Sequence, residues 1–133
     1  RAFTLVPADN MTDLFNADRR AQVWEALAEL FVGKELQDYD YAALARTLRH
    51  CAYAPDELER ILRDEVAPVW RHNLSPLAIP EMEGWPTEEV VTRIRQHIAN
   101  QPHGVRKLLA IMRRRRALPE LVIVRWTRLR RMI

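Results

Sequence analysis

The sequence has few of the residues on which many functional sites depend. Its single cysteine, Cys51, excludes an internal disulfide and fits a reducing compartment. Phosphate-binding loops and tight hairpins need residues that tolerate positive φ, and the sequence has only three glycines. Both structures are therefore disfavoured. No two of its four histidines stand three or four residues apart, the spacing of a helical metal site. We therefore expect no catalytic site, no metal and no cofactor.

Long apolar runs are also missing. No run approaches the roughly 20 residues needed to span a bilayer, and no basic-then-apolar signal opens the chain. A cytoplasmic protein is the expectation. Residues 1–17 are expected to be a flexible or partly ordered lead-in, of which 1–10 lack a helical period and look foreign to the native protein. A helical domain over 18–118 and a basic C-terminal helix or tail over 119–133 should follow.

The charge is divided unevenly along the chain. Residues 1–70 hold 8 Lys or Arg against 13 Asp or Glu, a net charge of −5. Residues 71–133 hold 13 against 5, a net charge of +8. Such an asymmetry bears on partners and solubility rather than on the fold.

Apolar residues recur at helical spacing through most of the chain. The pattern predicts a compact all-α domain, a bundle of five or six helices with a basic C-terminal segment. Asp18 is a candidate N-cap for the first helix and Gly33 a candidate left-handed C-terminal residue. The second helix should end near His50, and a third should start at Pro55. Later inward-facing residues are predicted at Val105, Leu108, Leu109 and Met112, in a helix that follows one capped by Thr87.

Two segments have less regular patterns. Residues 71–86, "RHNLSPLAIPEMEGWP", hold three prolines and should form an ordered connection packed down by Leu74, Leu77, Ile79 and Trp85. Residues 121–124 have strand-like composition, whereas Pro119 followed by Glu120 is a good helix start. We favour a helix for this last segment.

The arginine-rich end has three interpretations. It can be a solvated helix end, because cations favourably meet the free carbonyls there. It can be a basic segment that lies on an acidic protein or an anionic membrane. It can also bind nucleic-acid backbone, with one aromatic residue for stacking. The residues that would serve this last role are Arg113, Arg114, Arg115, Arg116, Arg125, Trp126, Arg128, Arg130 and Arg131.

A helix-turn-helix is disfavoured. Its recognition helix would run from Asp56 to Glu65, which holds five acids and two arginines and would repel phosphate. Glu65 itself falls between apolar residues on one helical face, where an unpaired carboxylate is costly. Either an arginine pairs with it, or Pro68 frays the turn so that it reaches water. A catalytic acid is the less favoured interpretation.

Much of the chain resembles a known family. The resemblance depends on Val23, Trp24, Leu27, Leu30, Phe31, Glu35, Leu36, Leu58, Ile61, Leu62, Glu65, Val66, Pro68, Asn73, Leu74 and Trp85. Over residues 19–98 the sequence is similar to an uncharacterised bacterial family of small all-helical proteins. The resemblance implies an all-helical fold and carries no activity with it.

Two functions are compatible with these patterns. The leading hypothesis is a non-catalytic protein-binding module, an immunity or antitoxin-like protein that binds a basic toxin domain, since complementary charge speeds encounter. The alternative is non-specific nucleic-acid binding through the C-terminal arginines. Each acid predicted to bind this partner can equally be an ordinary residue of a solvated helix face. The predicted partner-binding acids are Glu25, Glu29, Asp38, Asp40, Asp56, Glu57, Glu59 and Asp64.

Overall fold

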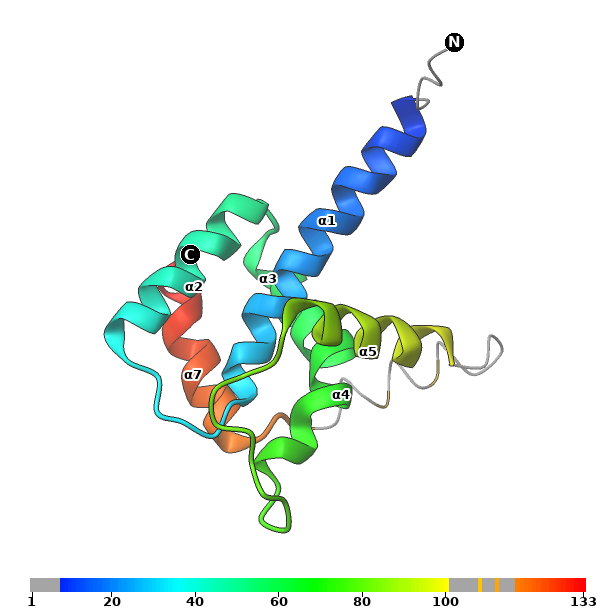
Figure 1. Cartoon of the computed structure of the whole chain (residues 1–133). Helices are drawn as coiled ribbons and strands as arrows, with labels where there is room; N and C mark the ends of the chain where they lie inside the picture. The colour runs from blue at the N-terminus through cyan, green and yellow to red at the C-terminus, as the bar shows by residue number, and fades with distance from the viewer. Residues whose placement is uncertain (1–7, 101–107, 109–111, 113–116) are drawn as a thin grey trace.

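The described part of the protein is a bundle of helices. The computed structural model describes residues 8–100, 108, 112 and 117–133, and within these residues there are helices and turns but no strand (Figure 1). The predicted all-α bundle is therefore confirmed. Its elements are α1 (Ala8–Ala28), η1 (Glu29–Phe31), α2 (Asp38–Cys51), α3 (Pro55–Ile61), η2 (Leu62–Val66), α4 (Ala67–Trp70), η3 (Arg71–Leu74), α5 (Thr87–Ala99) and α7 (Glu120–Arg130).

Helix α1 is longer than the sequence pattern predicts. It begins at Ala8, so Asp18 is not its N-cap but lies within it and accepts a 2.9 Å hydrogen bond from Gln22. Residues 8–17, assigned to the lead-in, are thus helical, and residues 1–7 lie outside the described part. The C-terminal half packs against α2 and α5, whereas the N-terminal half projects from the bundle (Figure 1).

The segment from Pro55 to Leu74 is one continuous run of helical turns of different widths. Helix α3 begins at Pro55 as predicted, and the chain then widens into the π turn η2 before Pro68. Pro68 has no N–H to donate to the carbonyl of Asp64, so a regular α-helical bond is lost at this point. The run continues through α4 instead of ending, and the π turn places Glu65 opposite α1.

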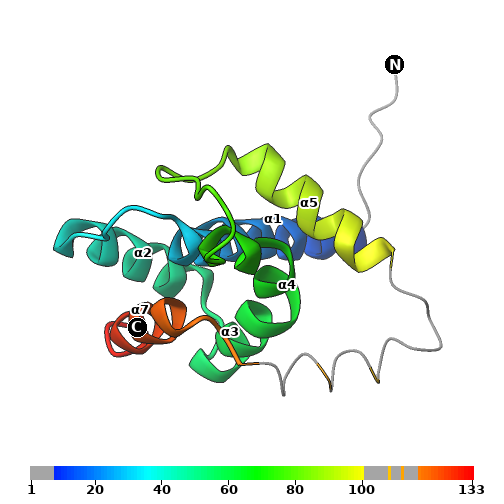
Figure 2. The ribbon, with the colours of Figure 1, turned by 90° about the horizontal axis from the view of Figure 1, so that it is seen from below.

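Helix α7 belongs to the core. Leu118 before it and Val122, Trp126 and Leu129 within it are at most 4% exposed. Their spacing of three or four residues turns one face inward, which confirms the helix over the strand. Burying Val122 and Leu129 stabilises the fold by about 1.5–3 kcal/mol each. The helix packs against α2 and η1, as the view from below shows (Figure 2).

Two predicted features of the connections are wrong. Gly33 is not left-handed; its N–H donates to the carbonyl of Glu81 at 2.7 Å, and a Cβ there would lie 2.6 Å from the Met82 sulfur. Thr87 does not cap its own helix, because its hydroxyl donates to Glu25 at 2.7 Å. The second helix ends at Cys51, which agrees with the predicted end near His50, and Ala52 follows in the left-handed region at φ 59°.

Some predicted core residues are exposed. Leu77 and Ile79 were expected to pack down the connection after η3, yet they are 97% and 99% exposed. Leu108 and Met112 are 58% and 57% exposed, which corrects their assignment to an inward face; Val105 and Leu109 lie outside the described residues. Trp85 does pack, edge-on to Trp70 with ring centroids 5.4 Å apart.

Candidate functional site

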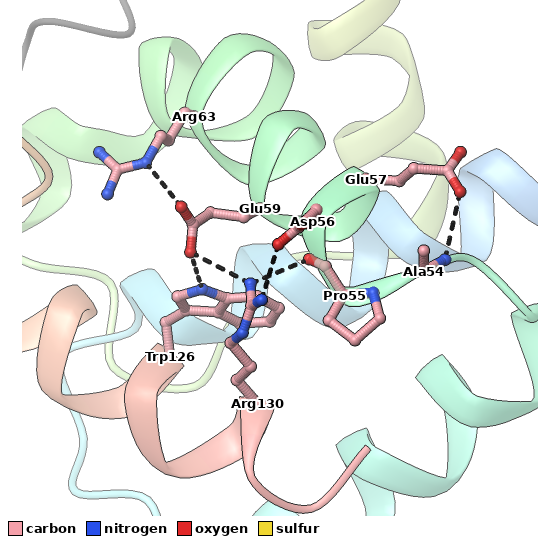
Figure 3. Close-up of polar contacts among 8 residues, drawn as sticks. All are labelled: Ala54, Pro55, Asp56, Glu57, Glu59, Arg63, Trp126 and Arg130. Atoms are coloured by element: carbon pink, nitrogen blue, oxygen red, sulfur yellow. Dashed lines mark hydrogen bonds and ion pairs between the residues drawn. The ribbon is translucent and has the colours of Figure 1, made fainter.

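The basic C-terminal helix binds the acids of α3. Arg130 donates to the Asp56 carboxylate at 2.7 Å and to the Pro55 carbonyl at 3.3 Å (Figure 3). The hydrogen bond from Arg130 lowers the pKa of Asp56, and the same bond raises the pKa of Arg130. Two surfaces that the sequence suggested for separate partners therefore meet within the molecule.

Glu59 is the central acid of this contact. Its Oε1 accepts the indole N–H of Trp126 at 2.9 Å and lies 3.4 Å from Arg130 Nη1, while its Oε2 lies 3.6 Å from Arg63 Nε (Figure 3). The carboxylate is thus engaged on both oxygens by groups of its own chain. It is not an open binding surface.

Asp38 is also paired with α7. Its carboxylate accepts a 2.5 Å hydrogen bond from Arg128, whose guanidinium lies 4.1 Å from the centroid of the Tyr41 ring. A cation over an aromatic face adds to the attraction between α7 and α2. Asp38, Asp56 and Glu59 together neutralise part of the positive charge of the C-terminal segment.

Arg125 has a structural position that excludes the predicted contact with nucleic acid. It is 4% exposed and donates to the carbonyls of Leu30, Val32 and Lys34 at 3.0, 2.8 and 2.7 Å. These carbonyls lie at and just beyond the end of η1, where a cation is favourable. Burial lowers the pKa of Arg125.

Little of the predicted nucleic-acid surface is left in the described residues. Trp126 is 4% exposed, so it, like Arg125, is inaccessible to a nucleic acid. Arg128 and Arg130 are partly exposed but paired with acids. Arg131 is exposed, and Arg113–Arg116 lie outside the described residues. Helix α3, which would begin the recognition helix, presents Asp56 and Glu59 to α7.

Two further predicted acids serve the ends of helices. Asp40 accepts the N–H of Gln37 at 2.8 Å, and Glu57 accepts the N–H of Ala54 at 3.3 Å. Both satisfy backbone donors near a helix start, as a capping box does. Their carboxylates retain exposed surface, but local backbone bonding is enough to explain their presence.

An acidic patch remains where α1, α2 and the connection before α5 meet. We define it as Glu25, Glu29, Asp40 and Glu83. Glu25 and Glu29 line a recess of about 200 Å³ on the α1–α2 side, whose other walls are Gln22, Ala26, Leu44 and Thr47. Of the eight predicted acids, the structure brings Glu25, Glu29 and Asp40 together here and adds Glu83, which the sequence pattern did not single out.

Glu29 is a partly buried member of the patch. Burial raises the pKa of Glu29; the nearby charge of Lys34 opposes this shift, while Asp40, Glu25 and Glu83 add to it. Gly84, at φ 107°, lies so close that a Cβ there would be 2.6 Å from Glu29 Oε1. The positive φ and this approach both require glycine at position 84. The fold thus partly buries the Glu29 carboxylate near three other carboxylates and Lys34.

A second recess lies on the other side of α1. It has a volume of about 240 Å³ and is lined by Arg20, Glu57, Arg60, Ile61, Asp64 and Glu65. The Glu65 carboxylate accepts hydrogen bonds from Nε and Nη2 of Arg20 at 3.0 and 2.9 Å and from the indole N–H of Trp24 at 2.8 Å. The expectation that an arginine pairs with Glu65 is confirmed, and this bonding makes the residue a structural one.

Other chemistry-bearing groups have structural surroundings. Cys51 is buried beside Gln22, and burial raises the pKa of its thiol, which keeps it protonated and unreactive. Across the described residues, no group of three or more His, Cys, Asp and Glu side chains could hold a metal ion. A search of the same residues finds no helix that could cross a membrane.

The fold and these contacts define a small all-helical domain whose charged helices pair mainly with one another. A family model described as a domain of unknown function (DUF7079) matches residues 18–132, and the chain belongs to this family. The match continues beyond residue 98, where the resemblance seen in the sequence ended, and includes α7. No curated protein and no solved structure matches the chain.

Proposed function

We propose that the protein is a non-catalytic binding module, a bacterial immunity or antitoxin-like protein that neutralises a basic toxin domain by direct contact in the cytoplasm. The contact surface is the acidic patch. Asp38, Asp56 and Glu59 are removed from the earlier set because α7 already occupies them. Of the described C-terminal arginines, Arg125, Arg128 and Arg130 are likewise engaged within the chain, which leaves less surface for nucleic acid than the sequence suggested.

The observation that carries the proposal is the environment of Glu29. Its carboxylate is half-buried and its pKa is raised by burial; the charge of Lys34 opposes this shift, and those of three other acids add to it. Holding such a charge costs stability unless a cation approaches it. Lys34 supplies one cation, which pairs with Glu83 at 3.4 Å, and a lysine or arginine from a partner would supply a second. The recess beside Glu25 and Glu29 has room for the end of such a side chain. The patch therefore suits a basic protein surface.

Charge complementarity also predicts the kinetics of binding. Opposite charges steer two proteins together and raise the association rate, an effect that salt reduces. A toxin inhibitor benefits from fast association because free toxin is harmful for as long as it persists. Neutralising the patch should consequently slow association more than it speeds dissociation.

The test uses the basic proteins encoded beside this gene, purified one at a time as probes. Association is measured with the unchanged protein and with Glu25→Gln/Glu29→Gln, and Glu120→Gln serves as an exposed control on α7. We expect one probe to bind, and the double variant to weaken binding by about tenfold or more. Unchanged affinity in the double variant, or no binding by any probe, would contradict the proposal.

A further inference from the structure

The connection between η3 and α5 presents two fully exposed aliphatic side chains. Leu77 and Ile79 are 97% and 99% exposed, while the other exposed large apolar side chains of the described residues range from 42% to 73%. The turn that bears them projects beyond the neighbouring helix ends (Figure 1). Single exposed apolar residues are ordinary on protein surfaces, but two complete side chains on one projecting turn are not.

This turn is fixed at its base by Asn73. The side chain of Asn73 is buried; its Nδ2 donates to the carbonyls of Phe31 and Glu81 at 2.8 and 3.1 Å, and its Oδ1 accepts the N–H of Glu81 at 2.7 Å. The N–H of Gly33 donates to the same Glu81 carbonyl at 2.7 Å. Both ends of the turn are therefore tied to the end of η1.

The tip of the turn is ordered too. Ala78 N–H donates to the Ser75 carbonyl at 3.1 Å, and Leu77 N–H lies 3.4 Å from the Ser75 hydroxyl. Pro76 and Pro80 restrict the backbone on either side of Leu77 and Ile79. A segment fixed before binding loses little conformational entropy when it docks. The geometry is that of a preformed contact rather than of a loose linker.

The charges around the turn indicate what it contacts. Residues 75–86 contain no lysine or arginine, and two acids, Glu81 and Glu83, follow the apolar tip. Acids disfavour an anionic membrane surface, which attracts basic segments. They suit an apolar pocket with a basic rim on a protein. Glu83 also belongs to the acidic patch, so the same connection carries the apolar tip and one member of the patch.

We propose that Leu77 and Ile79 insert into an apolar pocket of the basic protein that the acidic patch binds. This inference depends on the proposed function in requiring a protein partner. It adds the division of roles common in interfaces: buried apolar side chains supply most of the affinity, and surrounding charges steer and orient. Loss of the two side chains should therefore act mainly on the dissociation rate, unlike loss of the patch.

The first test is site-specific photo-crosslinking in the native host. A photoreactive amino acid replaces Leu77 or Ile79 in two variants of the full chain. A third variant, the control, carries it in place of Arg95, an exposed residue of α5. We expect the same protein to be crosslinked from 77 and 79 and not from 95. No crosslinked protein, crosslinking equally from 95, or crosslinking to lipid or to a second copy of this chain would overturn the inference.

The second test separates this inference from the proposed function. Leu77→Ser/Ile79→Ser and Glu25→Gln/Glu29→Gln are each titrated against the purified protein captured by crosslinking, with thermal melts of both variants. The loop variant should melt like the unchanged protein, because its lost side chains are solvent-exposed, and should bind about 100-fold more weakly through faster dissociation. Weakened binding in the patch variant alone would retain the proposed function and overturn the inference. Unchanged binding in both variants would overturn both.

Discussion

Arg20 and Glu65 form a two-bond ion pair that joins α1 to the π turn, although 45 positions separate them in the sequence. Trp24 donates to the same carboxylate, so one acid holds two residues of α1. The π turn before Pro68 brings Glu65 to this position. The pair therefore explains how an acid is accommodated within an apolar stripe.

Breaking this pair should destabilise the protein. Glu65→Gln keeps the volume but leaves Arg20 without its partner, and Arg20→Lys loses the planar fork. We expect each to lower the free energy of unfolding by about 1–2 kcal/mol, below the range for fully buried pairs because Arg20 is partly exposed. Urea denaturation measures the change. Glu89→Gln is the matched control, because its ion pair with Arg93 is exposed and should cost under about 0.5 kcal/mol. Equal effects at positions 65 and 89 would contradict this role for Glu65.

Arg125 should be among the least replaceable residues of the C-terminal segment. Arg125→Met removes donors to three carbonyls and leaves those oxygens poorly satisfied inside the protein. We expect a loss of about 2–4 kcal/mol in the free energy of unfolding. Arg131→Met, at an exposed position just after the same helix, should change it by less than about 0.5 kcal/mol. If the two substitutions have similar effects in denaturation experiments, the structural role of Arg125 is wrong.

The fold could be predicted from the sequence because helical spacing of apolar residues is a local property. The start of α3 at Pro55 follows from proline chemistry, and the inward face of residues 118–129 follows from the spacing of apolar residues. The charged contacts could not be predicted in this way. Arg125 and Arg131 have the same side chain in the same basic run, and only the packing of α7 against η1 makes one buried and leaves the other exposed.

The candidate site was predicted in part for the same reason. Glu25 and Glu29 stand on one face of a predicted helix, so their proximity could be inferred. The contribution of Glu83 depends on the fold of the connection, and the local pattern of that segment misled the assignment of Leu77 and Ile79. An apolar residue in a loop indicates burial only if a surface lies within its reach. The absence of a helical period in residues 75–86 was the signal that such a surface could not be assumed.

Ala52 is a position where a substitution should stabilise the protein. It ends α2 at φ 59° and ψ 32°, a left-handed conformation that disfavours a Cβ. Glycine adopts this conformation without that strain, although it also increases the entropy of the unfolded chain. We expect Ala52→Gly to raise the free energy of unfolding by about 0.5–1 kcal/mol and the melting temperature by about 1–4 °C. Ala43→Gly, at an exposed position inside α2, should instead lower it. A destabilised Ala52→Gly would contradict the expected relief of strain.

Glu29 links stability to the proposed function. Because burial raises its pKa above the ordinary 4.5, the folded protein binds more protons than the unfolded chain between these two values. The stability contributed by this residue therefore falls as pH rises through that window, and its ionised form weakens the fold at neutral pH. Glu29→Gln should stabilise the protein at pH 7, and the gain should disappear as the pH falls to 4.5 and below, in melts measured across this range. If Glu29→Gln also weakens binding of the basic partner, the charge is one that the fold retains at a cost because binding requires it. A variant that loses stability at pH 7 would show instead that Glu29 is a structural acid and would leave the patch without its main argument.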